Sequence, residues 1–165
     1  MTEFELVLGD LAFPEGPRWR EGELWFSDMQ GGEVVRLSPD GTRRTVVTLD
    51  EGECPSGLGF LPDGRLLVVA MHARQVLAVD ADGSTTVHAD LSEIATWHAN
   101  DMLVDSVGRA YVGNFGDSSA PPDPITPATL ALVQPDGTVT AAADQLDLPN
   151  GMVLLDDGRT LVVAE

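Results

Sequence analysis

Turns centred on glycine recur along this chain, and their spacing constrains its fold more than any other feature. Seven such turns are centred on Gly22, Gly41, Gly64, Gly83, Gly108, Gly137 and Gly158. Several have the sequence Pro-Asp-Gly, in which proline presets φ, aspartate caps the turn and glycine adopts a positive φ. Short runs rich in Val, Leu and aromatic residues separate the turns, and no segment keeps a helical period. The sequence therefore predicts an all-β chain of hairpins.

The longer spacing between these turns identifies the repeating unit. Gly22 and Gly64 are 42 residues apart, and Gly64 and Gly108 are 44 residues apart. A period of this length is typical of a four-stranded propeller blade, so we predict a β-propeller of about three and a half four-stranded blades. We expect one incomplete domain, residues 1–165, that belongs to a longer ring or completes a ring by association. The expected blades are 15–49, 56–89 and 100–143, with a half blade at 150–165.

The charge of the chain restricts its partners. It has 27 acidic residues against nine arginines and no lysine, which gives a formal net charge of −18. Nucleic acids and anionic membranes both require cationic surfaces, so we expect neither as a partner, whereas divalent cations are compatible. The longest apolar run, residues 66–71, is far too short to span a bilayer. With no visible signal peptide and one cysteine, Cys54, the sequence predicts a cytoplasmic protein and leaves the oligomeric state open.

One polar residue marks the start of the innermost strand in each expected blade. Ser56, Asn100 and Asn150 each lie eight residues before the first turn glycine of their blade, and Glu15 lies seven residues before Gly22. Innermost strands line the central channel of a propeller, so these side chains should form a ring of oxygen donors at one mouth of the channel. Such donors suit Ca²⁺. The alternative is that Asn and Ser cap turns at these positions.

Two further features fall at the same mouth of the channel. His98 lies two residues before Asn100, which makes it either a substrate contact or a packing residue. Segment 117–127 is a proline-rich insertion in the third blade, and it would either border the mouth or form a plain surface loop. We therefore expect this mouth to be the functional end of the channel.

Three short stretches carry a resemblance to a known family. They are Pro-Glu-Gly-Pro at 14–17 with Trp-Phe-Ser-Asp at 25–28, Asn-Asp-Met-Leu-Val-Asp at 100–105, and Pro-Asn-Gly-Met at 149–152. In this order and at this spacing, the sequence resembles the senescence marker protein/gluconolactonase (regucalcin-like) family of six-bladed propellers. The resemblance covers essentially the whole chain, as the N-terminal portion of such a propeller.

The resemblance implies a set of site residues. A divalent metal, usually Ca²⁺ and alternatively Zn²⁺, Mn²⁺ or Mg²⁺, would be bound by the residues that match Glu15 and Asn150. Asn100 matches a position that contacts the substrate and often the metal, and we expect Asp101 to orient Asn100. The remaining metal-binding aspartate of the family, usually also its base, is expected beyond Glu165. Where sugar-lactone members of the family have arginine, this chain has His98.

The activity that the resemblance implies is calcium-dependent hydrolysis of a small-molecule lactone or ester. The metal would polarise the lactone carbonyl as a Lewis acid and stabilise the oxyanion, while a carboxylate deprotonates the attacking water. Two alternatives remain open. One is a non-catalytic propeller that binds a ligand or partner at the mouth, and the other is an inactive piece that lacks the catalytic aspartate.

Overall fold

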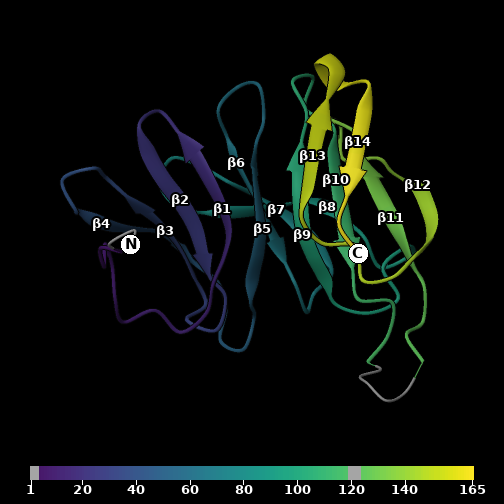
Figure 1. Cartoon of the computed structure of the whole chain (residues 1–165), viewed down its shortest axis with the longest axis horizontal. Coiled ribbons are helices and arrows are strands. Elements are labelled where there is room, and N and C mark those ends of the chain that lie inside the picture. Colours follow the sequence, from purple (N-terminus) through teal and green to yellow (C-terminus); the bar gives the residue numbers. More distant parts are fainter. Residues whose placement is uncertain (1–3, 119–123) are drawn as a thin grey trace.

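The computed structural model describes residues 4–118 and 124–165, and nearly all of its regular structure is antiparallel β-sheet (Figure 1). The first sheet contains β1 (Pro14–Arg20), β2 (Glu23–Asp28), β3 (Glu33–Leu37) and β4 (Arg43–Thr48). The second contains β5 (Pro55–Phe60), β6 (Leu66–Ala70), β7 (Gln75–Val79) and β8 (Thr85–Asp90). The third contains β9 (Ala99–Val104), β10 (Ala110–Asn114), β11 (Ala128–Val133) and β12 (Val139–Leu146). The last hairpin contains β13 (Met152–Leu155), the short 3₁₀-helix η1 (Asp156–Gly158) and β14 (Thr160–Val163).

Each four-stranded sheet is a meander in which strands pair with their neighbours in sequence. Three such sheets and one two-stranded hairpin follow one another along the chain, which confirms the expected all-β fold of about three and a half blades. Within residues 4–118 and 124–165, no helix has the length and apolar character needed to cross a membrane.

Apolar side chains fill the spaces between the first and second sheets and between the second and third sheets. Val34 and Val47 of the first sheet pack with Leu58 and Val68 of the second. A larger cluster joins the second sheet to the third and includes the fully buried Met102. Because the second sheet is covered on both faces, all five residues of β6 are buried, which explains its continuous apolar sequence.

The innermost strands of the second and third sheets approach each other closely. A Cβ atom added to Gly57 in β5 would lie 2.3 Å from the backbone nitrogen of Met102 in β9. A Cβ atom at Gly59 would lie 2.2 Å from Cγ2 of Val104. Glycine at these two positions therefore permits the inner strands to pack backbone against backbone, and this packing sets the spacing of the polar residues at their ends.

Candidate functional site

Four of the residues singled out from the sequence line one pocket. Glu15 comes from β1 and Asn100 from β9, while His98 directly precedes β9 and Asn150 directly precedes β13. The pocket has a volume of about 430 Å³, which is within the range of small-molecule sites. The structure thus brings Glu15, His98, Asn100 and Asn150 to a single place from three sheets.

The sheet ladders are irregular where the inner strands meet this pocket. Glu15, Ser56 and Asn100 are each the second residue of β1, β5 and β9. In each strand a β-bulge interrupts the pairing with the next strand. It lies between Glu15 and Arg18 in β1, between Pro55 and Leu58 in β5, and between Ala99 and Met102 in β9. Such bulges re-aim side chains and are common next to active sites. Gly16, with φ +55°, supplies the left-handed conformation that the first interruption requires, and a Cβ there would lie 3.0 Å from the carbonyl oxygen of Ser56.

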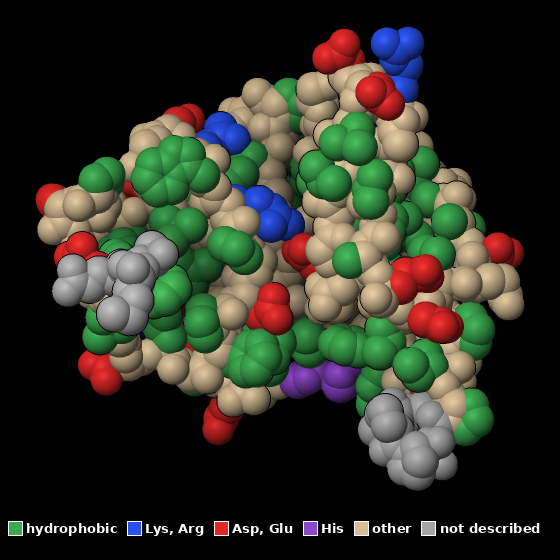
Figure 2. Space-filling view, viewed as in Figure 1, with side chains coloured by type: hydrophobic (Ala, Val, Ile, Leu, Met, Phe, Trp, Pro, Cys, Tyr) green, Lys and Arg blue, Asp and Glu red, His purple; other side chains and the backbone are tan. Residues whose placement is uncertain are grey.

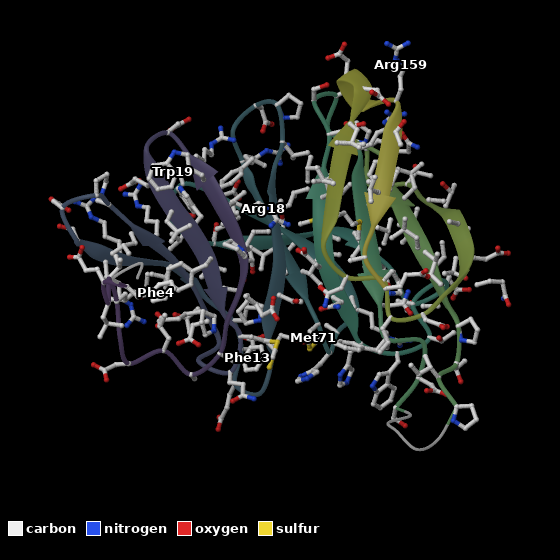
Figure 3. The ribbon with its side chains drawn as sticks, in the orientation of Figure 1. Phe4, Phe13, Arg18, Trp19, Met71 and Arg159 are labelled. Carbon is white, nitrogen blue, oxygen red and sulfur yellow. The ribbon has the colours of Figure 1, made fainter. Side chains whose placement is uncertain are left out.

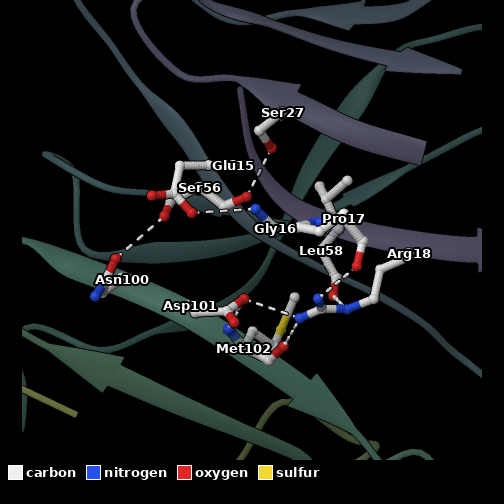
Figure 4. Close-up of polar contacts among 10 residues, drawn as sticks. All are labelled: Glu15, Gly16, Pro17, Arg18, Ser27, Ser56, Leu58, Asn100, Asp101 and Met102. Carbon is white, nitrogen blue, oxygen red and sulfur yellow. Dashed lines mark hydrogen bonds and ion pairs between the residues drawn. The ribbon is translucent and has the colours of Figure 1, made fainter. Parts of the chain in front are cut away.

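Hydrogen bonds connect the residues at the ends of the inner strands (Figure 4). Ser56 Oγ donates to Asn100 Oδ1 over 3.4 Å, and Ser27 Oγ donates to the carbonyl oxygen of Ser56 over 2.6 Å. The backbone N–H of Gly16 donates to Glu15 Oε2 over 3.2 Å. Asn100 is only 6% exposed, and Ser56 is 1% exposed. The amide of Asn100 is therefore held in one orientation at the edge of the pocket.

Arg18 is a residue that sequence reasoning missed, and it bonds to all three inner strands. Its Nε donates to the carbonyl oxygen of Leu58 over 2.9 Å, and its Nη2 lies 2.8 Å from Asp101 Oδ1 and also donates to the Met102 carbonyl. Figures 3 and 4 show Arg18 reaching from β1 across β5 to β9. Asp101 Oδ1 also accepts the backbone N–H of Met102 over 2.8 Å. The bonds of Asp101 within the described residues go to Arg18 and to the Met102 backbone, so they hold the strand that carries Asn100 and not the Asn100 side chain itself.

Aromatic and sulfur-containing side chains make the other walls of the pocket. The lining includes Phe13, Met29, Met71, Trp97 and Phe115. In Figure 3, Phe13 and Met71 lie near each other at the lower edge of the view, where Figure 2 shows histidine side chains among hydrophobic ones. Asp117 and Ser118, at the start of the proline-rich insertion, also line the pocket, whereas 119–123 lie outside the described residues.

His98 is enclosed between two rings at the pocket wall. The Trp97 ring stacks on it with centroids 4.5 Å apart, and the His72 ring lies 4.4 Å away at a tilt of 54°. Burial lowers the pKa of His98, and the nearby His72 and Arg74 lower it further against the opposing effect of Glu53. The imidazole of His98 is therefore neutral at pH 7.

The donor set of the pocket is chemically suited to a hard cation. Glu15 offers a carboxylate, and Asn100 and Asn150 offer amide oxygens, which are ligands that Ca²⁺ accepts in flexible geometry. Among the residues that the structure describes, no three His, Cys, Asp or Glu side chains gather in the way a zinc site requires. Ca²⁺ takes six to eight oxygen ligands, so these three side chains fit part of one coordination shell.

Comparisons with known proteins agree with this architecture. Residues 13–165 match the model of a family described as the SMP-30/Gluconolactonase/LRE-like region. Pentonolactonase XacC of Haloferax volcanii is 28% identical over 173 residues, which cover 100% of this chain and 54% of the relative. Lactonase drp35 of Staphylococcus epidermidis is 24% identical over 151 residues, which cover 88% of this chain and 45% of the relative. The chain thus spans about half the length of the curated relatives it matches.

Solved structures share the fold. A gluconolactonase from Xanthomonas campestris matches with a TM-score of 0.73 and 27% identity, covering 93% of this chain and 54% of that protein. A luciferin-regenerating enzyme matches with a TM-score of 0.80 and 18% identity, covering 96% of this chain and 54% of that protein.

Proposed function

Because this chain belongs to the SMP-30/gluconolactonase/LRE-like family, we propose that it supplies the metal-binding and substrate-binding pocket of a calcium-dependent lactone hydrolase. The observation that carries the proposal is the convergence of Glu15, Asn100 and Asn150 on one pocket of small-molecule size. Two relatives named as lactonases match across most or all of this chain, which supports the reaction class.

In this proposal Glu15, Asn100 and Asn150 hold Ca²⁺, with Mg²⁺ or Mn²⁺, which also prefer oxygen ligands, as substitutes. When bound, the ion polarises the lactone carbonyl and stabilises the negative charge that develops on its oxygen. Asn100 is restrained by Ser56 and is mostly buried, so its side-chain amide can contact the cation or the substrate without first being ordered. His98, neutral at pH 7, lines the same pocket and contacts the substrate.

Asp101 has a positioning role in this proposal. Its carboxylate is bonded to the Arg18 guanidinium and to the backbone N–H of Met102, so it is not placed to take a proton from water. It instead fixes the position of β9 relative to β1 and β5. The distance between Glu15 on β1 and Asn100 on β9 therefore depends on Arg18 and Asp101.

Lactone hydrolysis by the full-length protein that carries this sequence tests the proposal, because the chain spans about half the length of the lactonases it matches. Acid release from δ-valerolactone would be followed in a pH-stat with Ca²⁺ and with EDTA. We expect hydrolysis that requires Ca²⁺ and is abolished by Glu15→Gln or Asn150→Ala. The matched control is Glu51→Gln, which removes the same charge from an exposed turn outside the pocket. Full activity in both pocket variants, or activity that is unchanged by EDTA, would contradict the proposal.

A further inference from the structure

The geometry points to a substrate class: we propose that the pocket selects neutral lactones with an apolar substituent over anionic or polyhydroxylated lactones. The inference rests on the proposed function for the identity of the reaction and deepens it by naming what the pocket accepts. It comes from the pocket walls, which are distinct from the oxygen donors at the ends of the inner strands.

The walls offer apolar surface that a ligand could cover. Phe13 and Trp97 are 43% and 39% exposed, although both are large hydrophobic side chains, and both line the pocket. Met29, Met71 and Phe115 line it as well. Covering such surface with an apolar ligand removes it from water, which favours binding in proportion to the area covered.

Hydrogen bonds hold these walls in place before any ligand arrives. Asp28 is 3% exposed, and its Oδ1 accepts the backbone N–H groups of Phe13 over 2.7 Å and Ala12 over 3.0 Å. The backbone N–H of Phe115 donates to the carbonyl oxygen of His98 over 3.0 Å, and the Trp97 ring is stacked on His98. A preformed apolar wall costs little ordering on binding.

Among the described residues, the side chains that line the pocket include no arginine or lysine to bind an anionic substrate. All nine arginines lie in the described part of the chain, and none of them lines the pocket. The pocket lining instead includes two carboxylates, those of Glu15 and Asp117. In the metal-free chain, whose net charge is −18, a carboxylate or phosphate on the substrate would be repelled.

Sugar hydroxyl groups would meet a similar disadvantage. The polar side chains that would hold the cation and the lactone carbonyl lie at the ends of the inner strands, while much of the remaining wall is aromatic or thioether. A hydroxyl group buried against such a wall loses its hydrogen bonds to water without replacement. Selection against polyhydroxylated rings follows from this cost.

Three lactones with the same six-membered ring test the inference. δ-Valerolactone is the bare ring, δ-nonalactone adds a butyl group, and D-glucono-1,5-lactone adds hydroxyl groups. Binding to the intact chain would be measured in EDTA by isothermal titration calorimetry, with fresh lactone solutions. Each fully buried methylene strengthens binding about fourfold, so partial burial of the butyl group should make δ-nonalactone bind about tenfold more tightly than δ-valerolactone. D-Glucono-1,5-lactone should bind most weakly.

The walls are tested by a matched pair of tryptophan variants. Trp97→Ala should reduce the preference for δ-nonalactone to about threefold or less, because it removes part of the apolar wall. Trp19→Ala should preserve the preference, because Trp19 is 70% exposed on β1 and lies outside the pocket. Equal affinity for the three lactones, tighter binding of D-glucono-1,5-lactone, or equal effects of the two variants would overturn the inference.

The outcomes separate this inference from the proposed function. Preferential binding of δ-nonalactone without any calcium-dependent hydrolysis would sustain the inference about the pocket and refute the proposed reaction. Calcium-dependent hydrolysis with a preference for D-glucono-1,5-lactone would support the proposed reaction and refute the inference about the pocket.

Discussion

Replacing Arg18 by methionine tests whether one guanidinium holds the three inner strands together. Methionine keeps the unbranched apolar stem and removes the charge together with the bonds to Leu58, Asp101 and Met102. Removing one partner of a buried ion pair costs about 3–5 kcal/mol, because the other charge stays buried without compensation. Here the side chains of Arg18 and Asp101 are 25% and 12% exposed, so water screens part of the loss. We therefore expect the free energy of unfolding to fall by about 2–3 kcal/mol.

Urea unfolding followed by circular dichroism measures this change, with Arg65→Met as the control. Arg65 pairs with Asp63 over 2.9 Å, but their side chains are 47% and 53% exposed, so its loss should hardly change stability. A double-mutant cycle with Asp101→Asn should give a coupling of about 1–2 kcal/mol between Arg18 and Asp101. Two results would show that Arg18 does not hold the strands together. One is that Arg18→Met destabilises the chain no more than Arg65→Met, and the other is that the effects of Arg18→Met and Asp101→Asn are additive.

Two further predictions concern close packing and pH. Gly57→Ala should lower the free energy of unfolding by about 2–3 kcal/mol, because the added Cβ would lie 2.3 Å from the Met102 backbone nitrogen. Gly151→Ala is the control, and it should leave the urea midpoint nearly unchanged because the space around Gly151 is open. Equal urea midpoints for the two variants would contradict the strand packing. Burial lowers the pKa of His98 and of His88 below the ordinary value of 6.5. As the pH falls, these histidines are therefore protonated in the unfolded chain before they are protonated in the folded chain. The free energy of unfolding should accordingly fall as the pH drops below about 6.5. Urea midpoints measured at pH 7.5 and 5.5 should show this loss of stability, and the loss should be smaller in His98→Gln. An NMR titration that placed the midpoint of His98 above pH 6.5 would refute the lowered pKa of His98.

The turn glycines were sufficient to predict the architecture because a hairpin is a local structure. Gly22, Gly64, Gly108 and Gly158 each adopt positive φ, and the innermost strands begin shortly before them. Counting back from these turns located Glu15, Ser56, Asn100 and Asn150. The fold brings three of them to one pocket, whereas Ser56 is buried beneath Asn100 and does not line it.

Other parts of the site depend on contacts that no local pattern encodes. Arg18 bonds to residues 40 and 83 positions away, and a lone arginine in a strand carries no sign of such partners. The pocket walls likewise come from loops of different sheets, including Phe13, Met71 and Trp97. Composition alone could not predict that Phe13 and Trp97 stay partly exposed in one pocket while Met71 in the same wall is buried.

Calcium binding to this chain tests the central claim most directly, namely that Glu15, Asn100 and Asn150 hold one cation. Isothermal titration calorimetry in 150 mM KCl would screen weak binding to the acidic surface of a chain with net charge −18. We predict one Ca²⁺ per chain, bound about tenfold or more weakly by Glu15→Gln and with unchanged affinity by the surface control Glu51→Gln. Equal affinity in the two variants, or no saturable binding by the wild-type chain, would contradict the claim.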